Sequence, residues 1–150
     1  MAETLGMLCD KLTIVKLKQY HTEDEQRLKS LDAQAGQLQQ EIDEYVSDAV
    51  SGLIPLQKLT FAANKVYKKE GNEVPDVRGN LGEMFSQLAH VNCRLWHEVE
   101  KGYDIENLAV AEKDKLVKML AVLNLERNKC IDEIDKAFST LVTETRVEVK

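Results

Sequence analysis

The sequence contains a regular row of positions separated alternately by three and four residues. The row runs through Ile14, Leu17, His21, Asp24, Leu28, Leu31, Ala35, Leu38, Ile42, Tyr45 and Ala49. Residues at this spacing share one face of an α-helix, as the a and d positions of a coiled coil do. The row therefore predicts one continuous helix of nearly five heptads, with His21 and Asp24 as a polar layer buried in its apolar face.

This helix has one candidate boundary. Thr22 followed by Glu25 matches a capping box, which typically begins a helix, and the apolar residues up to Val15 follow a slightly different phase. A break between Val15 and Asp24 is therefore the alternative. No Gly or Pro forces such a break, so the continuous helix is the main prediction.

Three further helices are expected. One begins at Pro55 and ends before Gly71, because Pro suits the first turn of a helix and Gly suits its end. The next covers roughly 77–101, and Asp104 can cap a last, long helix. The apolar row of that last helix comprises Leu116, Leu120, Leu123, Cys130, Ile134, Ala137 and Leu141. Arg127 occupies the one missing position in this row.

The fold class predicted from these patterns is all-α. Only 5% of the residues are aromatic, and Leu, Lys, Glu, Gln and Ala favour helices over strands. We expect an antiparallel bundle of four or five helices, with long coiled-coil-like helices, forming a single domain over residues 1–139. Residues 140–150 form a tail that is strand-like or disordered, since β-branched residues alternate there with charged ones at Glu144, Arg146, Glu148 and Lys150.

The net charge of the chain and the length of its first predicted helix indicate which partners to expect. The 150 residues include 20 Lys and Arg against 26 Asp and Glu, a net charge of −6, which argues against a nucleic-acid partner. No apolar stretch is long enough to span a membrane. A helix of about 45 residues would extend roughly 68 Å, far beyond the second helix, so a homo-oligomer, most simply a dimer, is expected to cover its apolar face.

The sequence lacks the familiar cofactor and metal motifs, namely a Gly-rich phosphate loop, Cys-x-x-Cys, His-Glu-x-x-His and Gly-x-Ser-x-Gly. We therefore expect no metal and no cofactor. The three cysteines, Cys9, Cys93 and Cys130, are odd in number and far apart, and the first residues do not form a secretion signal. Reduced thiols and a cytoplasmic location are the corresponding expectations.

Several polar residues nevertheless share helix faces and form a candidate polar site. Asn92, Trp96 and Glu100 are spaced i, i+4, i+8, with His97 beside them, and Asn124, Asn128 and Asp135 lie on one side of the last helix next to Arg127. The structural interpretation is a network that sets helix register, or surface pairs of His and acid. The functional interpretation is a site in the bundle core to which facing helices contribute side chains.

Two of these segments carry a family resemblance. Asn92-x-x-Leu95-Trp96-His97-Glu98, followed by Asn124-x-x-Arg127-Asn128-x-x-Ile131-x-x-Ile134-Asp135, resembles a bacterial all-helical family of unknown function that is often encoded beside glycosyltransferase genes. The likeness spans roughly the C-terminal half. It implies a small cytosolic helical protein linked to surface polysaccharide assembly, and it implies no known activity.

Three functions follow as hypotheses. The favoured one is a non-enzymatic interaction or accessory protein. The second is a small enzyme or ligand-binding bundle that uses His97, Glu100, Arg127 and Asn128 on a phosphorylated or sugar-nucleotide compound, with Arg127 binding the anion. The third is an Mg²⁺-dependent all-α nucleotide pyrophosphatase. Its acidic pairs would be Glu41 with Glu44 and Asp132 with Asp135.

Overall fold

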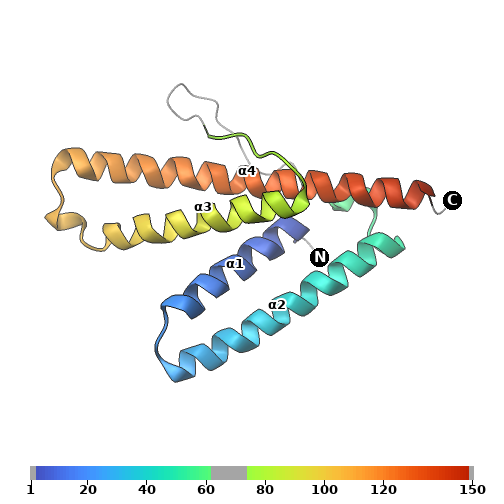
Figure 1. Cartoon of the computed structure of the whole chain (residues 1–150), viewed down its shortest axis with the longest axis horizontal. Coiled ribbons are helices and arrows are strands. Elements are labelled where there is room, and N and C mark those ends of the chain that lie inside the picture. The colour runs from blue at the N-terminus through green and yellow to red at the C-terminus, as the bar shows by residue number, and fades with distance from the viewer. Residues whose placement is uncertain (1–2, 62–73, 149–150) are drawn as a thin grey trace.

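The described part of the chain contains four α-helices, and the all-α prediction is confirmed. The computed structural model describes residues 3–61 and 74–148. The helices are α1 (Leu5–His21), α2 (Glu25–Ser51), α3 (Leu81–Gly102) and α4 (Val110–Glu148). Figure 1 shows α3 and α4 running antiparallel side by side, and α1 and α2 forming a second antiparallel hairpin. Helix α1 also packs against both α3 and α4, so it joins the two hairpins.

The prediction of one continuous helix from Ile14 to Ala49 is wrong. The chain leaves the helix at Thr22, which has extended backbone angles, and re-enters it after Asp24. Asp24 is the N-cap of α2, and its carboxylate accepts a hydrogen bond from the Arg27 backbone N–H at 3.0 Å. Such a cap satisfies a backbone donor that a new helix leaves unpaired. A side-chain cap therefore breaks the helix without Gly or Pro.

The break also overturns the predicted buried polar layer, because His21 and Asp24 are both exposed. The two halves of the row fold back on each other, and α2 buries Ala35, Leu38 and Tyr45 within the chain itself. The long uncovered face that would have required a dimer is therefore not formed.

The predicted strand-like or disordered tail is wrong as far as the structure describes it, since α4 continues to Glu148. Two features explain why β-branched residues remain helical there. Val142 is fully buried in the core, and the hydroxyls of Thr140, Thr143 and Thr145 donate to backbone carbonyls four residues earlier. Thr hydroxyls can be satisfied in this way inside a helix.

The connection between the hairpins also departs from the prediction. After Pro55 the structure has a short 3₁₀ helix, Leu56–Lys58, and the remainder of the predicted second helix lies largely outside the described residues. Helix α3 begins at Leu81, four residues later than expected, because Gly79 adopts a left-handed φ of 96° and the Glu83 carboxylate accepts from the Asn80 N–H at 3.2 Å. This is the capping box that starts the helix.

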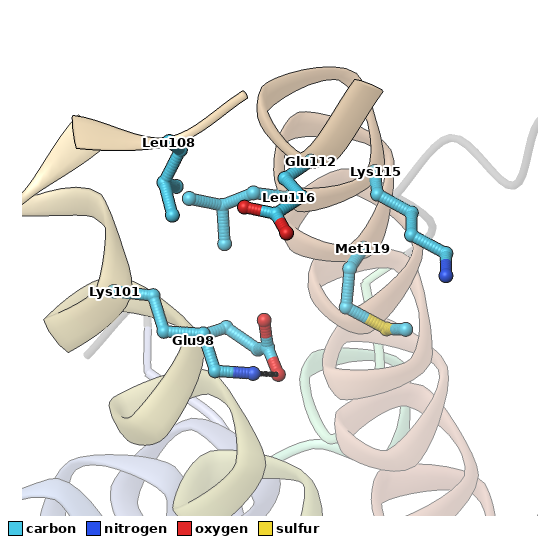
Figure 2. Close-up of a pocket in the computed structure, with 7 residues that line it drawn as sticks. All are labelled: Glu98, Lys101, Leu108, Glu112, Lys115, Leu116 and Met119. Carbon is cyan, nitrogen blue, oxygen red and sulfur yellow. Dashed lines mark hydrogen bonds and ion pairs between the residues drawn. The ribbon is translucent and has the colours of Figure 1, made fainter. Parts of the chain in front are cut away.

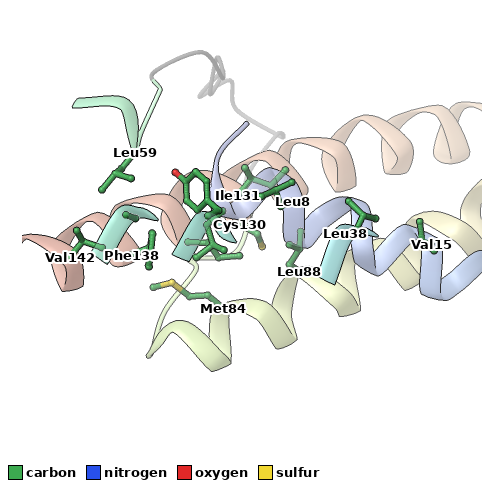
Figure 3. Close-up of a cluster of buried hydrophobic side chains, with 14 of the residues drawn as sticks. Leu8, Val15, Leu38, Leu59, Met84, Leu88, Cys130, Ile131, Phe138 and Val142 are labelled. Atoms are coloured by element: carbon green, nitrogen blue, oxygen red, sulfur yellow. The ribbon is translucent and has the colours of Figure 1, made fainter. Parts of the chain in front are cut away.

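All four helices contribute to one apolar core. Figure 3 shows Leu8 of α1, Leu38 of α2, Leu88 of α3 and Ile131 of α4 in the same cluster. Leu59, from the connection after the short 3₁₀ helix, is also fully buried. None of the helices in the described part of the chain is long and apolar enough to cross a membrane.

Candidate functional site

Asp10 is the centre of a polar network that joins three helices. The Arg127 Nε atom of α4 donates to Asp10 Oδ1 at 2.8 Å, and Arg127 Nη2 donates to Asp10 Oδ2. The Asn92 amide nitrogen of α3 donates to Asp10 Oδ1 at 2.9 Å. Asp10 itself, on α1, is only 3% exposed. The network therefore ties α1, α3 and α4 together at one level of the bundle.

The chemistry of this network is that of a satisfied ion pair. A bidentate Arg–carboxylate contact is the strongest common geometry for such a pair, and a buried carboxylate without a partner would be destabilising by several kcal/mol. The hydrogen bond to Asp10 raises the pKa of Arg127 further above its ordinary value. Arg127 is therefore a permanent cation whose charge Asp10 balances.

Asp10 does not belong to the predicted site. It interrupts the apolar run LGMLCDKLTIV near the start of the chain, and this interruption is the one signal that could have drawn attention to it. Its partner could not have been found from sequence, because Arg127 lies 117 residues further on.

A groove of about 310 Å³ lies directly beside this network, between α1 and the α3–α4 hairpin. We call it the groove. Its lining is Ile14 and Leu17 of α1, Asn92, Leu95, Trp96, Val99 and Glu100 of α3, Tyr103, and Asn124 and Arg127 of α4. Five residues of the candidate polar site line it, namely Asn92, Trp96, Glu100, Asn124 and Arg127. Pockets of this kind, with apolar walls and a few convergent polar groups, are typical of binding sites.

Trp96, which lines the groove, belongs to an aromatic cluster with two histidines outside the groove lining. The His21 ring stacks on Trp96 with a centroid distance of 4.7 Å and an interplanar angle of 21°. The Trp96 Nε1 atom donates to Glu100 Oε1 at 2.6 Å. His97 meets His21 edge to face at 6.4 Å between ring centroids. The two histidines thus lie close to Trp96 and to each other, at the end of α1.

Three residues of the candidate site do not line the groove. His97 is exposed and Asn128 is half-buried, and neither contributes to the wall. Asp135 belongs to a second buried cluster, two turns further along α4 than Arg127. There its Oδ1 accepts from the Gly6 backbone N–H at 2.7 Å, at the start of α1.

Asp135 and its neighbours have perturbed acidities. Burial raises the pKa of Asp135 to about 6, and hydrogen bonds from Thr4 and Gly6 limit the rise. Burial, with the nearby Asp135 charge, raises the pKa of Tyr45 to about 12 and of Cys9 to about 11. Burial likewise raises the pKa of Cys130 to about 11. Burial therefore disfavours the thiolate, the nucleophilic form of cysteine, at both Cys9 and Cys130.

A second cavity, of about 340 Å³, lies between the end of α3 and the start of α4. Figure 2 shows its lining, including Leu116 and Met119 of α4, with Glu98 and Lys101 of α3 paired to each other at 3.0 Å. It contains none of the predicted polar residues. We therefore place the candidate functional site at the groove.

No group of three or more His, Cys, Asp or Glu side chains within residues 3–61 and 74–148 is arranged to hold a metal ion. The acidic pairs named for the pyrophosphatase hypothesis do not converge with others into such a group, and Glu41 and Glu44 of α2 are both exposed.

Comparison of this chain with protein-family models, with curated proteins and with solved structures finds no match.

Proposed function

We propose that this protein is a non-enzymatic helical interaction protein. The observation that carries the proposal is a row of exposed apolar side chains at one end of the molecule. Val99 and Tyr103 at the end of α3 are 42% and 78% exposed, and Val110 and Val117 of α4 are 74% and 61% exposed. We call these four residues the apolar strip. Clustered exposed apolar side chains of this kind commonly mark interaction surfaces.

The apolar strip continues the groove outward. Val99 and Tyr103 belong to the groove lining, as does Asn124. Val117 and Val110 precede Asn124 by seven and fourteen residues, and a spacing of seven keeps residues on nearly the same face of a helix. The spacing therefore places Val110 and Val117 on the face of α4 that carries Asn124, which lines the groove together with Val99 and Tyr103.

The polar groups favour binding over catalysis. The Nε and Nη2 atoms of Arg127 already donate hydrogen bonds to the Asp10 carboxylate. The Glu100 carboxylate accepts a hydrogen bond from Trp96. A guanidinium in this state is poorly suited to clamp a phosphate, because its charge is balanced and Glu100 adds a negative charge to the same groove. These contacts support the interaction protein over an enzyme acting on a phosphorylated or sugar-nucleotide compound.

The partner that this surface fits best is a second copy of the chain. Figure 1 shows the end of the α3–α4 hairpin projecting beyond the α1–α2 hairpin. Two such hairpins packed about a two-fold axis would form a four-helix bundle, which covers the apolar strip of each. This dimer uses a different surface from the one expected from sequence. A cytoplasmic location and a link to polysaccharide assembly belong to the same proposal, the latter resting on the family resemblance alone.

Sedimentation equilibrium tests the proposal. We expect a dimer at micromolar concentration, and we expect the double variant Val110→Ser/Val117→Ser to weaken dimerisation at least about tenfold, since each substitution removes apolar burial. Val50→Ser/Leu53→Ser is the matched control, because both residues are exposed at the far end of the α1–α2 hairpin and outside the strip. A parent protein that remains monomeric at about 100 µM, or a control variant as impaired as the strip variant, would contradict the proposal.

A further inference from the structure

Three residues of α3 and its C-cap combine two aromatic rings with a carboxylate. Trp96, Glu100 and Tyr103 are spaced i, i+4, i+7, and Tyr103 keeps helical backbone angles of φ −67° and ψ −22°. Residues at this spacing lie on one face, and all three line the groove. Aromatic rings together with an acid are the groups that recognise an organic ammonium ion, through cation–π attraction and charge.

The electrostatics of the groove favour a cation. Arg127, the one basic residue in its lining, is balanced by Asp10. Glu100 takes no part in this balance and accepts one hydrogen bond, from Trp96, at Oε1. Among the ion pairs of the described residues, none joins a Lys or Arg to Glu100. The groove therefore carries a net negative charge at its outer end.

The rest of the groove is suited to an apolar chain. Ile14 and Leu17 of α1 face Leu95 and Val99 of α3 across it. Along α3, the distance from Glu100 back to Asn92 is eight residues, or roughly 12 Å of helix. An alkyl or aryl tail attached to the ammonium group would follow these apolar walls toward the network of Asp10.

We propose that the groove binds a small organic ammonium ion that carries an apolar tail. Its head lies beside Tyr103 and Glu100, on the side of Trp96 that lines the groove and not on the face that His21 covers. This site goes beyond the proposed interaction function. Val99 and Tyr103 belong both to the groove lining and to the apolar strip, so dimerisation and binding of the ammonium ion compete for these two residues. Val110 and Val117, whose substitution tests dimerisation, lie outside the groove lining.

Hexyltrimethylammonium is a suitable probe, because it combines a cationic head with a short tail and does not fluoresce. Trp96 is the only Trp in the chain, so its emission reports directly on the groove. We expect a saturable change in Trp96 emission and a rise in melting temperature with this probe. At the same ionic strength, heptanoate should give neither effect, and tetramethylammonium, which lacks the tail, should bind more weakly.

Glu100→Gln is the decisive variant, since Gln can still accept the Trp96 hydrogen bond and the substitution removes only the charge. We expect it to weaken binding of the probe about threefold to tenfold. Glu98→Gln is the matched control, because Glu98 lies on the same helix, lines the other cavity and pairs with Lys101; it should bind the probe as the parent does.

Both substituted side chains are on the surface or half-buried, so the variants should fold, and circular dichroism would verify this. Equal binding of heptanoate and the cation, or equal binding by Glu100→Gln and the parent, would overturn the proposal. The absence of saturation up to about 10 mM probe would overturn it as well.

Discussion

The guanidinium of Arg127 and the carboxylate of Asp10 form a two-point contact across the bundle, with Arg127 Nε 2.8 Å from Asp10 Oδ1. Asp10 is 3% exposed, so removal of the cation alone would leave a buried, uncompensated charge. Breaking such a pair on one side typically costs about 3–5 kcal/mol, whereas replacing both members is far less costly.

We therefore expect Arg127→Met to lower the free energy of unfolding by about 3–5 kcal/mol. The double variant Asp10→Asn/Arg127→Met should recover a large part of this loss, because the introduced amide is neutral and its oxygen can still accept from Asn92. Urea denaturation of the parent, both single variants and the double variant gives the coupling energy. A loss below about 0.5 kcal/mol for Arg127→Met would mean that the pair is not structural.

The raised pKa of Asp135 predicts a pH dependence of stability. Its pKa is about 6 in the folded protein against an ordinary value of 3.8, so between these values the folded state holds a proton that the unfolded state has released. Stability from this group is therefore fully present below about pH 4 and is lost as pH rises to about 6, by at most roughly 3 kcal/mol.

The Asp135→Asn variant isolates this contribution. Asn is neutral at all pH values and its oxygen can accept from the Gly6 N–H, so the difference in unfolding free energy between variant and parent should grow in favour of the variant from pH 4 to pH 7. Denaturant titrations at several pH values measure it. A difference that does not change with pH would show that Asp135 titrates alike in both states.

Gly6 and Gly36 both lie in helices, and substitution of each by Ala is expected to change stability in opposite directions. A Cβ added at Gly6 would lie 2.6 Å from the Ile131 carbonyl oxygen, whereas one added at Gly36 meets nothing within 4 Å. Gly6→Ala should therefore separate α1 from α4 and destabilise by about 1–3 kcal/mol. Gly36→Ala should stabilise by about 0.5–1 kcal/mol, because Ala is the better helix former. Thermal melts that show the same sign for both would contradict the close approach at Gly6.

Arg146 links the far end of α4 to the end of α2. Its Nη2 donates to the Ala49 and Ile54 carbonyl oxygens at 2.6 and 2.7 Å. These carbonyls lie at and just beyond the C-terminus of α2, an end that favours a cation. We expect Arg146→Met to lower the unfolding free energy by about 1.5–3 kcal/mol.

The control for Arg146 is Arg94→Met, since Arg94 is exposed and its guanidinium makes a long contact of 3.9 Å with the Met119 sulfur. Its effect should stay within about 0.5 kcal/mol. If chemical denaturation gives equal losses for the two variants, the contact with α2 does not stabilise the fold.

The sequence allowed the helices to be predicted better than their contacts. Periodicity and composition indicate an all-α fold, and the apolar row of α4 correctly marks Leu116, Leu123 and Ile134 as buried. The row from Ile14 to Ala49 misleads because its spacing continues through Asp24, where the side chain caps a new helix instead of facing the core. The spacing of residues along the chain does not distinguish an Asp that caps a new helix from an Asp that faces the core within a continuous helix.

The candidate site shows the same limit. Asn92, Trp96 and Glu100 could be placed on one face from their spacing alone, and the structure brings all three to the groove. The structure pairs Arg127 with Asp10 and places Asp135 apart from the groove, where it accepts from the Gly6 N–H. Both contacts depend on which helices are neighbours. This information is not contained in the periodicity of any one helix.

The position of α1 between the two hairpins has a consequence for the order of folding. Its buried polar contacts reach α4 across 117 and 129 residues, at Asp10–Arg127 and Gly6–Asp135. Closing loops of this length is entropically unfavourable until the enclosed segments are already structured. During synthesis on the ribosome, α1 and α2 can pair early, but Asp10 must remain hydrated until α4 has emerged. Helix α1 is synthesised before α2, α3 and α4, and it is therefore among the last of the four to reach its native surroundings.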